Sequence, residues 1–403
     1  MSDSKSLKNF SEHYPKEVRE LLSLILSKGF SLTLVGGAVR DFLLDGVVSK
    51  DLDFEIRLST HLSGDAWLEK LATLGKSLTK DHSYKVEVLS FNILRIKIAD
   101  YEVELSSPRQ ETFLDREALG HSDFSGTFSS DLNYTEAYKR RDFTVNAIGI
   151  EFLVGDEFKL VDPYSGVKDL SSKTLNYIDE SFFKDPVRFL RALRFKVKLG
   201  FTLSRELKDN IVYFNLEKLS KFYFLQEGRK IGLERMVYEM NFSVRKFAVK
   251  LPAWASEFSN IDTSLLSCIN SLEELLIAHA KNSKTSVESI EKLAKDLGIK
   301  KSVPSALISL RKLAQLDFKK VCDEISGLEF DKACAVEEIN SLVLARALKS
   351  KNSRELVGEF LSASFVEFIF CELEGLEKFE SLKSGIVPKQ RSMLGIYCHI
   401  NKN

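Results

Sequence analysis

Hydrophobic residues follow helix and strand periods in turn along the first part of this 403-residue chain. Apolar positions three and four residues apart predict amphipathic helices, whereas short apolar or alternating runs predict strands. The expected helices are Lys16–Lys28, Ala38–Leu44 and His61–Leu74, and the expected strands are Leu32–Val35, Asp51–Ile56, Ile93–Ile98 and Tyr101–Leu105. This order predicts an α+β fold with a small mixed β-sheet.

The pattern changes after residue 110. The stretch Gln110–Tyr138 has no clear period, and we expect it to be a loop, although structureless loops of this length are uncommon. Beyond residue 178 the spacing is helical throughout. The expected helices begin at Pro186 and then span Glu206–Leu219, Gln226–Met240, Ser264–Ala280, Ser286–Leu297, Val303–Leu316, Ala333–Leu348 and Arg354–Phe370. We therefore divide the chain into residues 1–177, 178–250 and 251–403.

Composition limits the classes of function. The chain has 58 basic and 58 acidic residues, so binding to RNA would depend on local basic surface and not on net charge. Lys295–Lys301 and Arg346–Arg354 are basic clusters that suit RNA phosphates or simply a solvated helix face. The polar N-terminus and the absence of a long apolar run predict a cytoplasmic protein without a membrane span. Nothing in the pattern indicates an oligomeric state.

The cysteines are scattered. No CxxC pair occurs, which argues against a zinc site and predicts reduced thiols in the core. They are Cys268, Cys322, Cys334, Cys371 and Cys398.

The stretch from Leu34 to Arg57 carries the first chemical signature. Gly36 and Gly37 follow a predicted strand, where they permit a tight turn whose N–H groups approach a bound anion. Asp51 and Asp53 stand two residues apart at the start of the next strand, so their side chains share a face. A Gly pair before a helix and a pair of aspartates on a strand are each common. Together they suit the binding of Mg²⁺ against a triphosphate.

Two further stretches offer charged groups for a nucleotide. In RRDFTVNA, Arg140 and Arg141 offer fork-like donors for phosphate, and Asp142 is able to accept from a ribose hydroxyl. Glu102 and Glu104 share one face of a predicted strand, and on spacing alone they are better explained as an exposed pair. We keep Glu104 as a possible third carboxylate of a two-metal site.

The helix that begins at Pro186 carries further charged residues at regular spacing. Asp185 followed by Pro186 is a helix start, and Arg188, Arg191 and Arg194 recur along one side, which by itself also suits a solvated basic stripe. An Asp and an Arg three residues apart present an acceptor beside donors. Cytosine and adenine complement that order through an amine and a ring nitrogen, whereas uracil and guanine place a carbonyl where the amine is needed.

These motifs together resemble the polymerase-β-like nucleotidyltransferases. The series GGxxRDxxL, DxD, RRDFTxNA and DxxR is similar to the class II branch, which contains CCA-adding enzymes and bacterial poly(A) polymerases. The resemblance covers roughly the first 200 residues. It implies a catalytic head at 1–177, a helical neck at 178–250 that selects the base, and a helical body and tail at 251–403 that bind tRNA.

The resemblance also implies roles for single residues. Asp51 and Asp53 would hold Mg²⁺, and Glu104, followed five residues later by Arg109, would complete the catalytic set. The residues expected to bind the nucleotide are Gly36, Gly37, Arg40, Arg140, Arg141, Asp142, Asp185, Arg188, Arg191 and Arg194. The long stretch before Arg140 corresponds to a loop that helps the family change between nucleotides.

Two positions depart from the family pattern. Ala137 stands where an Asp is common, and Lys184 stands where a Glu is usual. The leading hypothesis is a CTP/ATP:tRNA nucleotidyltransferase that adds CCA to tRNA. A poly(A) polymerase, a CC-adding or an A-adding enzyme of the same family is the alternative. A non-catalytic RNA-binding paralogue is the other, less favoured alternative.

Overall fold

The structure is a computed structural model and describes residues 10–153, 157–262, 269, 271–315 and 360. They fall into two compact units. One contains the described residues up to Ile231 together with Phe242–Lys250, and the other contains Gly232–Asn241 and the described residues from Leu251 onward. Several sequence predictions lie outside the described residues: all five cysteines, the predicted helix Ala333–Leu348 and the basic cluster Arg346–Arg354. The predicted helix Arg354–Phe370 is described at residue 360 alone. The three-part division proposed from sequence stays a prediction.

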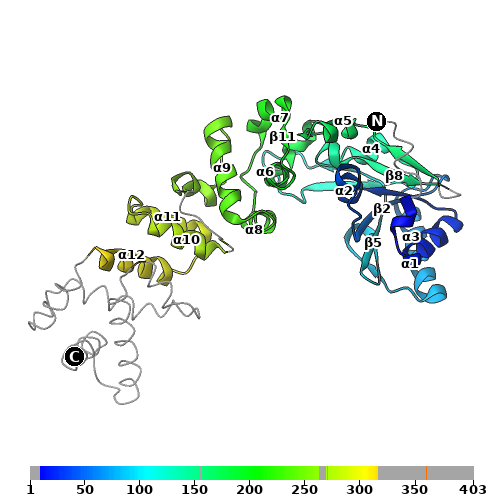
Figure 1. Cartoon of the computed structure of the whole chain (residues 1–403), viewed down its shortest axis with the longest axis horizontal. Helices are drawn as coiled ribbons and strands as arrows, with labels where there is room; N and C mark the ends of the chain where they lie inside the picture. Colours follow the sequence, from blue (N-terminus) through cyan, green and yellow to red (C-terminus); the bar gives the residue numbers. More distant parts are fainter. Residues whose placement is uncertain (1–9, 154–156, 263–268, 270, 316–359, 361–403) are drawn as a thin grey trace, which may run out of the picture. The chain divides into compact units, whose positions relative to one another are not determined.

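A mixed β-sheet forms the centre of the first unit, as the sequence predicted (Figure 1). Its strand order is β3-β4-β5-β2-β1-β8-β9. Strands β2 and β5 pair in parallel, and the other neighbours pair antiparallel. The strands are β1 (Ser31–Val35), β2 (Asp51–Arg57), β3 (Val86–Val88), β4 (Leu94–Ile98), β5 (Tyr101–Ser106), β8 (Gly149–Phe152) and β9 (Phe158–Val161).

Three amphipathic helices accompany this sheet where the hydrophobic pattern predicted them. They are α1 (Lys16–Ser27), α2 (Gly37–Asp45) and α3 (Gly64–His82). Helix α3 is longer than predicted because its buried face continues past Leu74 through Leu78. Helices α1 and α3 lie side by side, and Lys28 at the end of α1 donates to Ser77 Oγ at 3.0 Å.

The predicted loop Gln110–Tyr138 is wrong. Strands β6 (Arg109–Phe113) and β7 (Phe124–Phe128) form an antiparallel hairpin, and α4 (Tyr134–Tyr138) follows it. Both strands alternate between half-buried and exposed positions. Their exposed positions carry Ser, Thr and Gln, and Arg109, Glu111 and Gly126 occupy half-buried positions, so the apolar alternation is too weak to predict a strand.

A short connection leads from the sheet to the following helices. Asp162 caps α5 (Gly166–Ser171) by accepting from the backbone N–H of Gly166 at 2.6 Å. Asp169 accepts from Thr144 Oγ1 at 2.6 Å and so braces the turn that follows Asp142. Ser165 has a φ of 57°, a left-handed conformation that glycine adopts without strain.

The helices after residue 178 confirm the predicted start at Pro186 but not every boundary. Helix α6 (Pro186–Leu199) is capped by Asp185, which accepts from the backbone N–H of Val187 at 2.9 Å. The predicted helix Gln226–Met240 is wrong, because Gly232 has a φ of 91° and lies between two helices. The remaining elements are η4 (Glu180–Lys184), α7 (Arg205–Asn210), η5 (Ile211–Tyr213), α8 (Lys221–Gly228), α9 (Leu233–Phe247), and β10 (Thr174–Leu175), which pairs with β11 (Thr202–Leu203).

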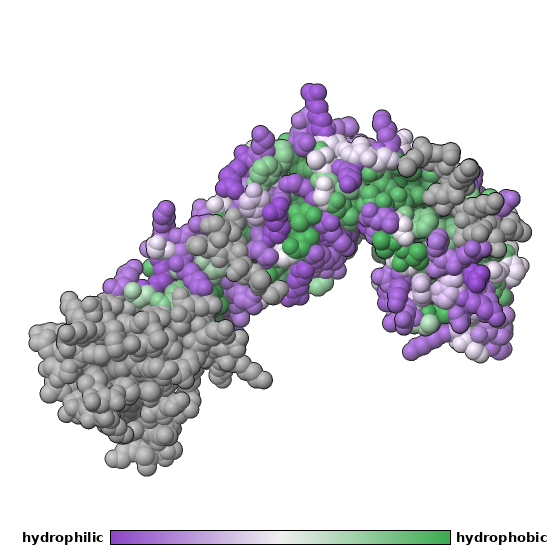
Figure 2. Space-filling view, viewed as in Figure 1, coloured by the Kyte–Doolittle hydropathy of each residue, from purple (hydrophilic) through white to green (hydrophobic). Residues whose placement is uncertain are grey.

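The described part of the second unit is helical, as predicted. Its elements are the first part of α9, up to Asn241, followed by η6 (Ala253–Asn260), α10 (Leu272–Lys281), α11 (Val287–Leu297) and α12 (Ser302–Ala314). The lysines of Lys295–Lys301 are exposed at the end of α11 and the start of α12, and their contact with RNA stays a prediction. In the view of Figure 2, hydrophilic residues cover most of the described surface, with hydrophobic patches between them. None of the described helices is long and apolar enough to cross a membrane.

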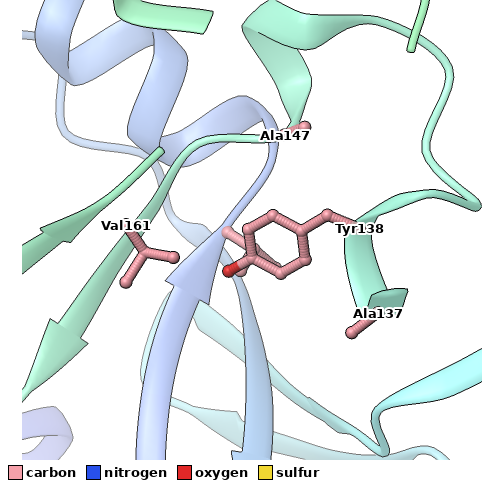
Figure 3. Packing of buried hydrophobic residues seen from close by; sticks show 5 residues of the cluster. Ala137, Tyr138, Ala147 and Val161 are labelled. Atoms are coloured by element: carbon pink, nitrogen blue, oxygen red, sulfur yellow. The ribbon is translucent and has the colours of Figure 1, made fainter. Parts of the chain in front are cut away.

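Tyr138 anchors the segment that leads into the double arginine. Its ring packs with Val35, Ala137, Ala147 and Val161, all of them buried (Figure 3). Ala137 is fully buried in this cluster, where the carboxylate of an Asp would lose its hydration. The hydroxyl of Tyr138 is buried and makes no hydrogen bond within the described structure.

Two substitutions separate the ring of Tyr138 from its hydroxyl. Tyr138→Ala should lower the free energy of unfolding by about 3–5 kcal/mol, because it leaves a large cavity. Tyr138→Phe should leave that free energy unchanged or raise it by up to about 1 kcal/mol, because it removes an unpaired buried hydroxyl. Urea unfolding measures both, and a loss in Tyr138→Phe as large as in Tyr138→Ala would contradict this account.

Candidate active site

A cleft of about 660 Å³ in the first unit gathers most of the residues singled out from sequence. Its walls come from the Gly turn, the double arginine, the β6–β7 hairpin, α6 and α8. The predicted site residues that line it are Gly36, Gly37, Arg40, Asp53, Arg140, Arg141, Asp142, Asp185, Arg188, Arg191 and Arg194. Asp51 and Glu104 are not among the lining residues, although both neighbour Asp53. The predicted base-reading pair therefore shares one cleft with a predicted catalytic carboxylate.

The Gly turn brings backbone close to charged side chains. Gly36 has a φ of 78°, which side-chain-bearing residues rarely adopt. A Cβ placed there would lie 3.4 Å from Arg141 Nη1 and 4.0 Å from Asp53 Oδ2. The turn thus leaves room for a guanidinium and a carboxylate on the same side of its backbone.

The parallel pairing of β2 with β5 sets the carboxylates beside one another. Asp51 lies opposite Glu102, and Asp53 lies opposite Glu104. The pKa of Asp53 is raised, first because the walls of the cleft reduce its hydration and then because Glu104 and Asp51 add like charge. Crowded carboxylates of this kind favour a bound cation or proton.

Glu104 already has a partner that sequence reasoning missed. Arg95 on the antiparallel neighbour β4 lies opposite Glu104 and donates to its Oε1 from Nε at 2.9 Å and from Nη2 at 2.7 Å. Arg95 also lies 3.1 Å from Glu102. Within the described residues no three His, Cys, Asp or Glu side chains form a complete metal site. A metal ion here would therefore need ligands from a bound substrate.

The double arginine is a cationic wall with few anionic partners. The Arg140 guanidinium makes no side-chain hydrogen bond or ion pair with the described residues, and its Nε is buried. Burial, followed by the charges of Arg109 and Arg141, lowers the pKa of Arg140 to about 9. Arg141 Nη1 donates to the backbone oxygen of Asn146 at 3.3 Å. These cations are placed for an anion supplied from outside the chain.

Asp142 is the buried centre of a network. Its Oδ1 accepts from the backbone N–H of Phe143 at 2.8 Å and from Asn146 Nδ2 at 2.9 Å, and its Oδ2 accepts from Arg191 Nε at 2.7 Å. Asn146 in turn accepts from Arg40 Nη1 at 2.6 Å. Although burial opposes ionisation, Arg191 and these donors lower the pKa of Asp142 to about 2. Both carboxylate oxygens of Asp142 already accept hydrogen bonds from the protein. A further hydrogen bond from a ribose hydroxyl to Asp142 stays a prediction.

The three arginines of α6 do not form a solvated stripe. Arg188 Nη2 donates to the backbone oxygen of Arg140 at 2.7 Å, and Arg191 pairs with Asp142. Arg194 lies 2.7 Å from Glu227 of α8 and stacks over the Phe195 ring at 4.0 Å. Arg188 and Arg191 are thus fixed by the segment Arg140–Asp142, and Arg194 is fixed by α8.

His121 is a second residue that sequence reasoning missed. It lies between β6 and β7, and its Nδ1 is 2.8 Å from Asp185 Oδ2. Its ring also packs edge-on against Tyr223 of α8, with centroids 4.9 Å apart. An isolated His in a stretch without a predicted structure offered no signal for this contact. Lys184, the departure next to Asp185, is exposed.

The buried charge of Asp142 predicts a pH-dependent stability. Its folded pKa of about 2 is below its ordinary value of 3.8, so its contribution is present at neutral pH and is lost as the pH falls toward 2. Asp142→Asn should lower the free energy of unfolding by about 2–3 kcal/mol at pH 7, and the difference should shrink below about pH 4. Urea unfolding at several pH values measures it.

The exposed Asp115, in the β6–β7 connection, provides a matched control. Asp115→Asn should change stability by less than about 0.5 kcal/mol. A difference between Asp142→Asn and the unsubstituted chain that stays equal from pH 7 to pH 2.5 would refute the ionised clamp.

The first comparison concerns families. Residues 32–176 match the family described as poly A polymerase head domain. The chain is 35% identical over 174 residues to an A-adding tRNA nucleotidyltransferase from Aquifex aeolicus. It is 34% identical over 180 residues to a multifunctional CCA protein from Psychromonas ingrahamii. These matches cover 43% and 44% of this chain but only 19% and 38% of the two relatives, so the chain matches well under two thirds of their length.

The second comparison concerns solved structures. A CCA-adding enzyme in an apo form aligns over 99% of this chain and 98% of its own, with a TM-score of 0.60 and 17% identity. A CCA-adding enzyme in complex with CTP aligns over 99% and 93%, with a TM-score of 0.58 and 18% identity. At this identity the likeness concerns the fold. It agrees with the α+β head and the helical remainder predicted from sequence.

Proposed function

We propose, from the match of residues 32–176 to the poly A polymerase head domain, that the chain adds CCA to the 3′ end of tRNA, using CTP and ATP. The observation that carries the proposal is the single cleft shared by Asp53, the double arginine and the pair Asp185 and Arg188. A nucleotide needs all three kinds of group: a carboxylate near the reacting phosphate, cations for the phosphate chain, and a reader for the base.

We assign the phosphate groups of the bound nucleotide to cleft arginines. Arg140 and Arg141 would take the triphosphate, since both line the cleft, Arg140 has no carboxylate partner among the described side chains, and Arg141 lies beside the Gly turn. Arg40 would add positive charge near the pyrophosphate that leaves. Arg191 and Arg194 would hold these groups in place through their own ion pairs with Asp142 and Glu227.

Base selection is assigned to Asp185 and Arg188. Both are buried in the cleft wall, and Asp185 Oδ2 lies 3.7 Å from Arg188 Nε. Held at fixed positions, an acceptor and a donor fork would pair with cytosine or adenine and disfavour uracil and guanine. The rejected bases would leave buried polar groups unpaired, which costs more than a lost hydrogen bond.

A magnesium cofactor fits the residues present. Asp51 and Asp53 would hold it, since a cation would offset the burial and the like charges of Glu104 and Asp51 that raise the pKa of Asp53. When bound, Mg²⁺ supplies charge neutralisation for the phosphate oxygens, which would complete its coordination. Glu104, tied to Arg95, would stand beside Asp53 and favour loss of the proton from the attacking 3′-hydroxyl.

The remaining assignments extend this proposal to the whole chain. The segment 1–177 would be the catalytic head, 178–250 the base-selecting neck, and 251–403 the part that binds tRNA. Maturation of tRNA would place the protein in the cytoplasm.

A second candidate function is A addition alone. It is favoured by the A-adding relative from Aquifex aeolicus, which is 35% identical over 174 residues. The two candidates share a head and differ in which ends they extend, so they require different RNA substrates to be told apart.

The test uses tRNA transcripts ending before CCA, after one C, and after CC, each with single nucleotides. We expect CTP to extend the first two, ATP to extend the third, and UTP and GTP to extend none. Extension of the third alone would replace the proposal with A addition, and long A tails would replace it with poly(A) synthesis.

Asp53→Ala tests catalysis in the same assay. We expect a loss of at least about a thousandfold in kcat, because it removes a group that acts on the transferring phosphate. The control is Asp100→Ala, an exposed aspartate on the same sheet that pairs with Lys50. Full activity in Asp53→Ala would favour a non-catalytic RNA-binding role.

His121 should affect which base is chosen. Its contact with Asp185 Oδ2 fixes the carboxylate that would read the base amine. His121→Ala should lower the ratio of kcat/KM for CTP over UTP by roughly two- to tenfold, as expected for one lost hydrogen bond. The matched control is His61→Ala, since His61 forms a similar 2.8 Å contact with Asp131. An unchanged ratio in His121→Ala, or the same fall in His61→Ala, would rule out this role.

A further inference from the structure

The turn between β3 and β4 holds an exposed aromatic ring at the edge of the cleft. Phe91 lines the cleft together with Asp53, yet 45% of its surface is exposed. A single exposed apolar side chain is common on protein surfaces, so the exposure of Phe91 alone does not indicate a ligand. Phe91 belongs neither to the carboxylates nor to the arginines of the proposed mechanism, so its exposure needs a separate explanation.

The backbone at Phe91 is strained. Phe91 has φ 60° and ψ 24°, and the next residue, Asn92, has φ 54°. These are the left-handed conformations of a type I′ turn, which favours Asn and Gly and disfavours a bulky residue at the first central position. The turn is held by the backbone N–H of Leu89, which donates to Ile93 O at 2.9 Å. A strained, exposed Phe kept at a site edge points to a function for its ring.

Neighbouring side chains support the ring. The Phe124 ring from β7 lies nearly parallel to it, with an interplanar angle of 16° and centroids 5.9 Å apart. The Arg109 guanidinium lies over Phe91 at 4.6 Å, and Glu111 fixes that guanidinium at 2.7 Å. A near-parallel pair of rings with a stacked arginine is the arrangement with which proteins hold unpaired nucleobases.

The position of the Phe91 ring relative to Arg188 indicates which part of the substrates it would contact. A second contact series runs from Phe124 through Phe113 to Arg188, with 6.2 Å between the rings and 5.9 Å from the guanidinium to Phe113. Arg188 is assigned to the incoming base, so Phe91 lies at the other end of this series, three contacts away. Asp53 lines the same cleft, so a chain end stacked on Phe91 would lie in the cleft that holds the proposed catalytic carboxylate.

We propose that Phe91, backed by Phe124 and Arg109, is a stacking platform for the unpaired 3′-terminal base of the RNA primer. This inference rests on the proposed function and adds a subsite for the second substrate. Stacking is tolerant of sequence, because every base offers a flat face. The platform would therefore accept a primer end whether its last base is the tRNA's own or a newly added C.

The first experiment measures RNA binding without nucleotides. The probes are a tRNA transcript ending before CCA and the same transcript with an abasic 3′-terminal nucleotide, and fluorescence anisotropy gives each Kd. The chain should bind the abasic transcript roughly five- to one-hundredfold more weakly. Phe91→Asn should weaken binding of the ordinary transcript to a similar degree and should leave the abasic transcript nearly unaffected.

Phe91→Asn also separates a ligand role from a structural one. Because Asn adopts the left-handed turn readily, this variant should keep or raise the Tm while it weakens RNA binding. Phe91→Trp should restore binding. The control Val88→Ala removes another exposed apolar side chain, 61% exposed on β3, and should change neither Kd.

The second experiment measures nucleotide transfer by the same variants. Phe91→Asn should raise the KM for the primer while the KM for CTP stays unchanged. Equal binding of the ordinary and abasic transcripts, or binding in Phe91→Asn equal to the unsubstituted chain, would overturn the platform. Failure of the unsubstituted chain to transfer any nucleotide would instead overturn the proposed function, and the binding experiment keeps the two outcomes apart.

Discussion

The buried carboxylate of Asp142 ties together the two parts of the sequence that the cleft needs. It joins the turn after the double arginine, through Phe143 N–H and Asn146, to Arg191 of α6. A buried charge is tolerable only when its hydrogen-bonding sites are filled, and here each oxygen has charged or amide donors. The same network reaches Arg40 at the Gly turn through Asn146. One ionised group thereby sets the relative positions of the Gly turn, the arginines and the base-reading helix.

Around this clamp the cleft separates charges that would otherwise neutralise each other. Burial, followed by the like charges of Glu104 and Asp51 on the paired strands β5 and β2, raises the pKa of Asp53. The Arg141 guanidinium approaches the same side of Gly36 as Asp53 without forming an ion pair with it, and Arg140 has no carboxylate partner among the described side chains. Cations and anions held apart in this way leave room for a metal ion and a phosphate chain between them. Phosphoryl transfer needs positioning and charge stabilisation from the protein and little covalent chemistry, and these preorganised charges would supply both.

The sequence predicted those parts of the site in which spacing along one element determines position. The Gly pair, the DxD, the double arginine and the Asp185–Arg188 pair are each local patterns, and the structure brings residues of all four into one cleft. Contacts between elements could not be predicted in this way. Arg95 faces Glu104 through strand register, and His121 reaches Asp185 from a hairpin whose polar, Gly-containing strands carry no clear alternation. Ser165 shows a third case, since its left-handed backbone is visible only once the turn is built.

The central claim is that a fixed carboxylate and guanidinium choose the base without a nucleic-acid template. The most direct measurement is calorimetric binding of the four nucleoside triphosphates to the chain in the absence of RNA and in the presence of Mg²⁺. The account predicts that CTP and ATP bind at least about tenfold more tightly than UTP and GTP, the difference expected for one mismatched buried pair. Equal affinity for all four nucleotides would contradict it.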